Sequence, residues 1–226
     1  MHYYQKIKMR IIVFFVFSML SIAAIGQVGE IKPFDQSSED PDLKQFIERL
    51  KVAVSKRDKE YIKTIIASST YIPFEGGETT TSEEFYDFYF NQTDHGYDLW
   101  EDLEYIFSIG GGGFGKSKNE FYMPYTSANI HDSDPFTELG TYVIALSPST
   151  HVYERPDTNS KIVATLNYNI VEVDYEEYQT KWETIVLDTG RKGYVKSSDV
   201  IYTVSTRSGF IKEDGKWKLK FAGPYE

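Results

Sequence analysis

Cysteine is absent from this 226-residue chain, and its absence excludes three features. No disulfide can support the fold, so each domain must be stabilised by its buried core alone. No thiol is available as a nucleophile, which excludes the cysteine-dependent peptidases. A lipid anchor that needs a cysteine beside a cleavage site is excluded for the same reason.

Recognisable catalytic motifs are also missing. The histidines His95, His131 and His151 do not stand in H-E-x-x-H, and no serine stands in G-x-S-x-G. Weak candidates for a metal site are His131, Asp132 and Asp134, because imidazole and carboxylate ligands lie within a few residues of each other. We predict a protein that is not an enzyme and holds no cofactor. A metal-assisted hydrolase using these three residues is the least favoured alternative.

Positive charge is scarce, with 24 Lys and Arg residues against 34 Asp and Glu residues and a net charge of −10. Nucleic acids and anionic membranes are bound through basic clusters that displace counterions, so this balance argues against both partners. Beyond residue 26, where a predicted export signal ends, no apolar run is long enough to span a bilayer. We therefore expect no membrane insertion of the mature chain, which is the part that follows the signal.

The N-terminus has the pattern of an export signal. Three basic residues precede an uncharged apolar run over 11–25, and Ala24-Ile25-Gly26 has the small-x-small form of a cleavage site. We predict a signal peptide at 1–26 and an exported protein, periplasmic or secreted, that is not a lipoprotein. Retention of the signal as an anchor is the alternative.

The patterns beyond the signal predict a helical half followed by strands. Residues 27–42 are polar and contain two prolines, which is typical of a linker. Apolar side chains then recur at helical spacing, as in Leu43, Phe46, Ile47 and Leu50, and we expect a mostly helical domain over 43–140. After Gly140 the period changes to two, which indicates short strands.

A hairpin is predicted at the end of the chain. Glu213-Asp214-Gly215 is a strong turn signal between two alternating segments. Two strands alone are marginally stable in water, so we expect the hairpin over 204–226 to pack on the helical domain. The strands over 141–203 then form an excursion inside a larger folded unit.

Those strands resemble a bacterial SH3-like (SH3b) domain. The matching residues are Val152, Pro156, Ser160-Lys161-Ile162-Val163, Leu166, Trp182, Val186 and Gly193-Tyr194-Val195. The chain departs from the family at Glu154-Arg155, where Arg followed by Ser and Gly is more usual. The order of segments over most of the mature chain is also similar to a group of exported bacterial SH3 domain-containing proteins. The resemblance implies a small barrel that binds ligands and a location in the cell envelope.

The predicted fold class is α+β, with a mostly helical N-terminal domain, a small SH3-like β-barrel over 141–203 and a C-terminal β-hairpin. Aromatic side chains provide contact area at a low entropic cost. We expect ligand contacts from Tyr153, Glu154, Arg155, Tyr168 and Tyr178. Trp182 and Tyr194 are expected in the core, and Tyr153 is expected to be exposed.

One literal motif match is expected to be spurious. Residues 110–117 read GGGGFGKS and satisfy the phosphate-loop pattern G-x-x-x-x-G-K-[ST]. Such a loop follows a strand and opens a long helix, whereas a helix is predicted before this run and Pro124 follows soon after it. We expect no nucleotide binding. The glycines indicate either a flexible connection or a close backbone crossing.

The sequence therefore predicts a non-catalytic exported protein whose SH3-like barrel contacts a cell-wall peptide or an envelope protein. An alternative is a protein-interaction or inhibitor module that acts through the acidic helical domain.

Overall fold

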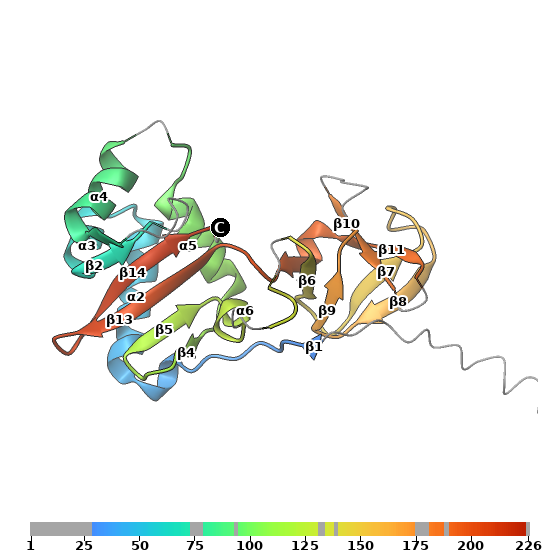
Figure 1. The fold of residues 1–226 in the computed structure, drawn as a ribbon, viewed down its shortest axis with the longest axis horizontal. Coiled ribbons are helices and arrows are strands. Elements are labelled where there is room, and N and C mark those ends of the chain that lie inside the picture. Colours follow the sequence, from blue (N-terminus) through green and yellow to red (C-terminus); the bar gives the residue numbers. More distant parts are fainter. Residues whose placement is uncertain are drawn as a thin grey trace, which may run out of the picture.

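The chain folds into two lobes, a larger one of helices and sheet and a smaller one of strands (Figure 1). The computed structural model describes residues 29–72, 79–92, 95–130, 134–137, 140–174, 181–187 and 190–224. Helices and strands both contribute substantially, so the predicted α+β class is confirmed. The predicted SH3-like β-barrel over 141–203 is not a closed barrel, because its strands form open sheets.

Capping residues mark where several helices begin. Asp40 accepts backbone hydrogen bonds from Asp42 and Leu43 at the start of α2. Thr81 and Glu84 form the predicted capping box of α4. The helices are η1 Ser37–Glu39, α2 Pro41–Ser55, α3 Lys59–Ile65, α4 Ser82–Asn91, α5 Leu99–Ile109, α6 Tyr125–Ala128 and η3 Ser197–Asp199.

The sheet of the larger lobe has the order β14-β13-β5-β4, and its neighbours are antiparallel. Its strands are β4 Gly113–Phe114, β5 Glu120–Met123, β13 Arg207–Glu213 and β14 Lys216–Gly223. Helices α2 and α5 pack against this sheet and bury Leu50, Leu103, Phe210 and Leu219. A short hairpin lies against α4 and β14; it consists of β2 Ser69–Tyr71 and β3 Thr79–Thr81.

The C-terminal hairpin is part of this sheet and not a separate cover. Strand β13 pairs with β14 on one side and with β5 on the other. Lys212 Nζ and Trp217 Nε1 both donate to Asp40 Oδ2, at 2.9 and 3.2 Å, which ties the hairpin to the start of α2. The chain thus leaves the larger lobe after α6, forms the smaller lobe, and returns to complete the first sheet.

Two four-stranded sheets form the smaller lobe, in the orders β1-β9-β6-β12 and β10-β11-β7-β8. An isolated bridge between Val173 and Ile185 joins them. Val152, Leu166 and Val195 are buried in the core that the two sheets share. The strands are β1 Gly29–Glu30, β6 Tyr142–Ala145, β7 Thr150–Tyr153, β8 Ile162–Leu166, β9 Asn169–Glu172, β10 Trp182–Val186, β11 Lys192–Lys196 and β12 Val200–Tyr202.

The sheet β1-β9-β6-β12 is buried on both faces. In β6, Val143 and Ala145 belong to the core of the smaller lobe, whereas Ile144 belongs to a cluster at the junction of the lobes. Ile170 of β9 and Ile201 of β12 join Ile144 in this cluster. Their partners from outside the sheet include Ile31, Phe34, Ile109 and Tyr125. Because both faces are covered, β6 is an uninterrupted apolar run.

The predicted linker, 27–42, is a strap between the lobes in its described part. Strand β1 pairs with β9 of the smaller lobe, and Asp35 forms a parallel bridge with Gly112 of the larger lobe. The Gln36 Oε1 atom accepts a hydrogen bond from the Phe114 N–H at 3.0 Å. Polar composition suggested a linker, but backbone pairing to both lobes makes the segment part of the fold.

The glycine run of 110–117 lets chain segments approach closely. A Cβ on Gly111 would overlap the carbonyl oxygen of Phe34, and the φ of Gly111, +63°, is left-handed. A Cβ on Gly112 would lie 2.6 Å from the carbonyl oxygen of Tyr122. The run is therefore a backbone crossing, one of the two interpretations that the sequence left open.

Gly111→Ala should lower the free energy of unfolding by roughly 3 kcal/mol or more, because left-handed strain and a steric clash act together. Gly96→Ala is the matched control, since Gly96 has a φ of +76° but nothing within 4 Å of an added Cβ. Strain alone should cost that variant about 1 kcal/mol. Urea unfolding measures the free energy of unfolding of both variants. An equal decrease for Gly111→Ala and Gly96→Ala would contradict the close backbone crossing.

Candidate functional site

The outer face of the sheet β10-β11-β7-β8 carries a group of aromatic side chains. Tyr194 of β11 lies opposite Tyr153 of β7 in the strand register. The Tyr153 ring meets Trp182 of β10 edge-to-face, with ring centroids 5.5 Å apart, and His151 lies 6.2 Å from Tyr153. We call Trp182, Tyr194, Tyr153 and His151 the aromatic face.

Strand alternation produces the aromatic face. Val152 and Val195, the neighbours of Tyr153 and Tyr194 in sequence, are fully buried in the core of the smaller lobe. A period of two sends these valines inward and the aromatic rings outward. The rings therefore stand on paired strands above a packed core, although the register of β7 against β8 shifts between Val152 and Tyr153. A packed core beneath the strands fixes the positions of the rings.

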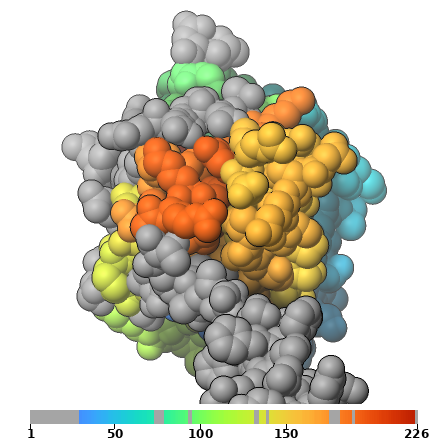
Figure 2. Space-filling view, turned by 90° about the vertical axis from the view of Figure 1, so that its right-hand side faces the viewer, coloured from blue at the N-terminus to red at the C-terminus, as the bar shows by residue number. Residues whose placement is uncertain are grey.

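The aromatic face lies on the sheet that points away from the larger lobe. The larger lobe packs on the other sheet of the smaller lobe (Figure 1). Figure 2 looks at the free end of the molecule, where residues of β7 and β8 lie beside residues of β10 and β11. Trp182 and Tyr194 are half-buried, His151 is exposed, and Ile162 on the adjoining β8 is 46% exposed.

The structure separates the predicted ligand-binding residues. Tyr153 is only 9% exposed, whereas the Glu154-Arg155 pair is exposed in the loop after β7. Tyr168 lies at the opposite end of β8, in the turn before β9. Burial, together with the nearby Tyr168, raises the pKa of Tyr125 to about 12, which places Tyr168 near the junction of the lobes. Tyr178 lies outside the described residues.

Exposure within the aromatic face is the reverse of the sequence-based expectation. Tyr153 was expected at the surface and is nearly buried, whereas Trp182 and Tyr194 were expected in the core and are half-buried on the outer face. One pattern in the sequence could have indicated that Tyr194 lies on the outer face of β11. Tyr194 stands between Lys192 and Lys196 at a spacing of two, and lysines at alternate positions indicate an outward-facing row.

The weak metal candidates do not form a described site. His131 and Asp132 lie outside the described residues, and the Asp134 carbonyl oxygen accepts a hydrogen bond from Thr137 Oγ1 at 2.8 Å. Within the described ranges, no three His, Asp or Glu side chains are grouped as a metal ion requires. Nor does any helix in those ranges have the length and apolar character needed to cross a membrane.

The segment that matches the phosphate-loop pattern has different neighbours from a phosphate-binding loop. Helix α5 precedes it and strands β4 and β5 follow, whereas such a loop lies between a strand and a helix. Two of its backbone donors are also occupied within the protein. The Gly112 N–H donates to the Phe34 carbonyl oxygen at 3.1 Å, and the Gly115 N–H donates to that of Glu120 at 3.0 Å.

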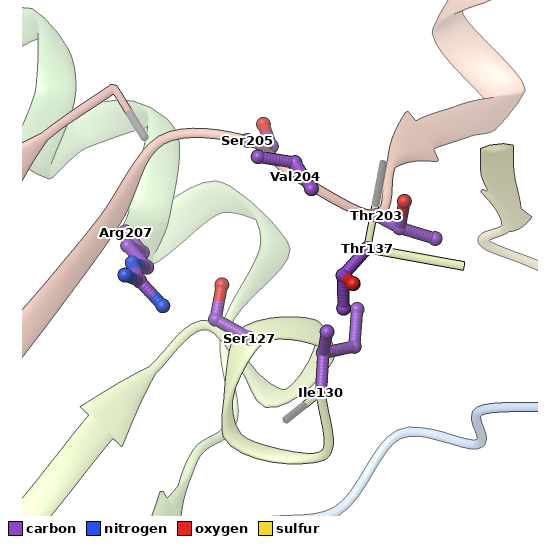
Figure 3. Close-up of a pocket in the computed structure, with 7 residues that line it drawn as sticks. All are labelled: Ser127, Ile130, Thr137, Thr203, Val204, Ser205 and Arg207. Atoms are coloured by element: carbon purple, nitrogen blue, oxygen red, sulfur yellow. The ribbon is translucent and has the colours of Figure 1, made fainter. Parts of the chain in front are cut away.

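A small cavity lies where the chain returns from the smaller lobe to the larger one. Its volume of about 20 Å³ holds roughly one water molecule. Figure 3 shows its lining residues: Ser127, Ile130, Thr137, Thr203, Val204, Ser205 and Arg207. Thr203 Oγ1 donates to the carbonyl oxygen of Phe136 at 2.8 Å, so this hydroxyl fastens the returning segment. We interpret the cavity as part of the packing of the junction.

The carboxyl group of Asp102, in the first turn of α5, lies where a negative charge is unfavourable. Burial raises its pKa to about 6, and the nearby carboxylates of Asp98 and Glu101 add to the rise. Its Oδ2 atom is buried and has no hydrogen-bond partner among the described residues. Folding therefore makes the protonated form of Asp102 more favourable than it is in the unfolded chain.

The sequence matches no model of a known protein family, and a comparison with curated proteins found no matching protein.

Asp102→Asn should raise the melting temperature more at about pH 7.5 than at about pH 4.5. The folded chain holds the Asp102 proton more tightly than the unfolded chain, whose ordinary pKa is 3.8. The stability that this proton contributes is complete below the unfolded value and is lost as the pH rises through about 6. Thermal scans by circular dichroism measure the difference.

The control for this experiment is Glu104→Gln, which neutralises an exposed carboxylate on the same helix. It should change the melting temperature little at either pH. An Asp102→Asn gain of equal size at both pH values would contradict the raised pKa.

Proposed function

We propose that this protein is a non-catalytic exported binding protein whose aromatic face holds a peptide of the bacterial cell wall. The observation that carries the proposal is the aromatic face itself, whose rings stand on the sheet that points away from the larger lobe. The SH3-like features of the same strands agree with a binding role. An envelope protein is the other ligand class that these features suggest.

The chemistry of the aromatic face suits a peptide. Aromatic rings give a large contact area and lose little conformational entropy on binding. Lys196 lies opposite Trp182 in the strand register and places a positive charge near the rings. Stem peptides of the cell wall combine carboxylates with small apolar side chains, so they offer partners for both the lysine and the rings.

A second candidate function has one observation in its favour. Residues 82–109, which include α4 and α5, contain eight acidic residues and no Lys or Arg. A basic partner fits such a surface by charge complementarity, as expected for a protein-interaction or inhibitor module. Polylysine is a suitable probe for this function. The function is favoured if replacing Glu101 and Glu104 by Gln weakens the binding of polylysine while Trp182→Ala leaves that binding unchanged.

Trp182→Ala should weaken the binding of soluble cell-wall muropeptides roughly tenfold or more, because a tryptophan at the centre of a contact carries much of its energy. His151→Ala should have a smaller effect. Isothermal titration calorimetry measures both, after circular dichroism has shown that the variants fold. Tyr105→Ala is the matched control, since it removes a 39% exposed aromatic side chain from α5 of the larger lobe.

Tryptophan fluorescence provides an independent measurement on the unaltered chain. Trp100 and Trp217 are 5% and 4% exposed, whereas Trp182 is half-buried, so a ligand on the aromatic face should change mainly the Trp182 emission. The proposal fails if purified sacculi retain the wild-type protein no better than the Trp182→Ala variant. Capture of an envelope protein without muropeptide binding would assign the aromatic face to that ligand class instead.

A further inference from the structure

A groove crosses the larger lobe beside α2, α3 and the tip of the β13–β14 hairpin. It consists of two hollows of about 440 and 430 Å³, each large enough for a ligand. Gln45, Arg49 and Tyr61 line both hollows, so the two are continuous. Val52, 52% exposed, lines one hollow and Trp217 lines the other. This elongated shape suits an extended chain better than a compact ligand.

The acidic side chains of the groove have partners within the protein. Asp58 accepts a backbone hydrogen bond at the start of α3, at 3.0 Å. The Glu48 carboxylate lies 3.8 Å from Lys51 Nζ, and the Asp42 carboxylate lies 3.9 Å from Lys212 Nζ. These intrachain contacts offset part of the negative charge that lines the groove.

The basic side chains of the groove are less occupied. Lys218 Nζ donates to the Thr64 carbonyl oxygen at 2.6 Å. Arg49, Lys56 and Lys216, in contrast, make no ion pair or side-chain hydrogen bond with any residue that the structure describes. The groove therefore presents positive charge that the surrounding chain does not neutralise.

The wider surroundings of the groove are also basic. Residues 43–66 carry seven basic and three acidic side chains, and residues 207–220 carry five basic and two acidic ones. These segments pack together through α2, α3 and β14. A chain with a net charge of −10 thus gathers half of its 24 basic residues in the two segments that flank the groove.

We propose that the groove is a second binding site, separate from the aromatic face, for an acidic peptide segment of a partner protein. Carboxylates of the peptide pair with Arg49, Lys56 and Lys216, and an apolar side chain between them contacts Val52 and the ring of Tyr61. The positive charge along the groove selects an acidic ligand. Its length selects an extended one.

The probe for this site is a fluorescein-labelled peptide of alternating glutamate and leucine, with a glutamine–leucine peptide of equal length as the neutral comparison. The full chain should bind the acidic peptide about tenfold or more tightly than the neutral one, as measured by fluorescence anisotropy. Added salt should weaken the binding of the acidic peptide, because exposed charges are screened.

Charge reversal locates the site. Lys56→Glu and Lys216→Glu should each weaken binding of the acidic peptide roughly tenfold. Lys161→Glu is the matched control, because it changes the net charge equally at an exposed position of the smaller lobe and should leave the affinity unchanged. The Trp182→Ala variant should bind the acidic peptide as tightly as the wild-type chain does. The experiment can therefore reject the groove as a binding site without rejecting the aromatic face, and the reverse.

Three outcomes would overturn the proposal. Equal weakening by Lys161→Glu and Lys216→Glu would show that only the net charge matters. Binding to vesicles of anionic lipid that the acidic peptide does not reverse would assign the basic surface to membranes. The third outcome is that the chain does not bind the peptide but self-associates in analytical ultracentrifugation, and that Lys216→Glu abolishes the self-association. This outcome would assign the groove to a second copy of the chain.

Discussion

The structure depends above all on one sheet that is buried on both sides. In β6, Val143 contributes to the core of the smaller lobe, while its neighbour Ile144 contributes to the junction with the larger lobe. Full burial of one such side chain contributes about 1.5–3 kcal/mol, and the same strand does this in two directions. The sheet β1-β9-β6-β12 therefore stabilises the smaller lobe and attaches it to the larger one at the same time.

Chain connections add to this attachment. The strap that contains Asp35 and Gln36 pairs with both lobes, and the C-terminal hairpin returns to complete the sheet of the larger lobe. The smaller lobe is thus held by its buried face and by the segments that enter and leave it. These constraints leave the sheet β10-β11-β7-β8 as the side of the smaller lobe that faces away from the larger lobe (Figure 1).

The two proposed surfaces differ in chemistry and lie on different lobes. The aromatic face offers rings with a lysine nearby, whereas the groove beside α2 and α3 offers unneutralised positive charge. A junction built from buried isoleucines holds the lobes together. A protein that binds a wall peptide with one lobe and an acidic segment with the other would connect a partner to the cell wall, and this role requires both proposals to hold.

The sequence alone determined the features that depend on neighbours along the chain. The apolar stripe from Leu43 to Leu50, the Thr81–Glu84 capping box and the turn at Glu213-Asp214-Gly215 all predicted elements that the structure contains. Local propensity and hydrophobic period are sufficient for such elements, since the interactions that form them span only a few residues.

Contacts between segments that are distant in sequence determine which sides of those elements are covered. The tertiary structure opened the expected barrel into two sheets, placed Trp182 on the outer face while nearly burying Tyr153, and brought distant basic segments to one groove. Burial depends on what packs against a strand from elsewhere in the chain, and the period of two is the same whichever face is covered.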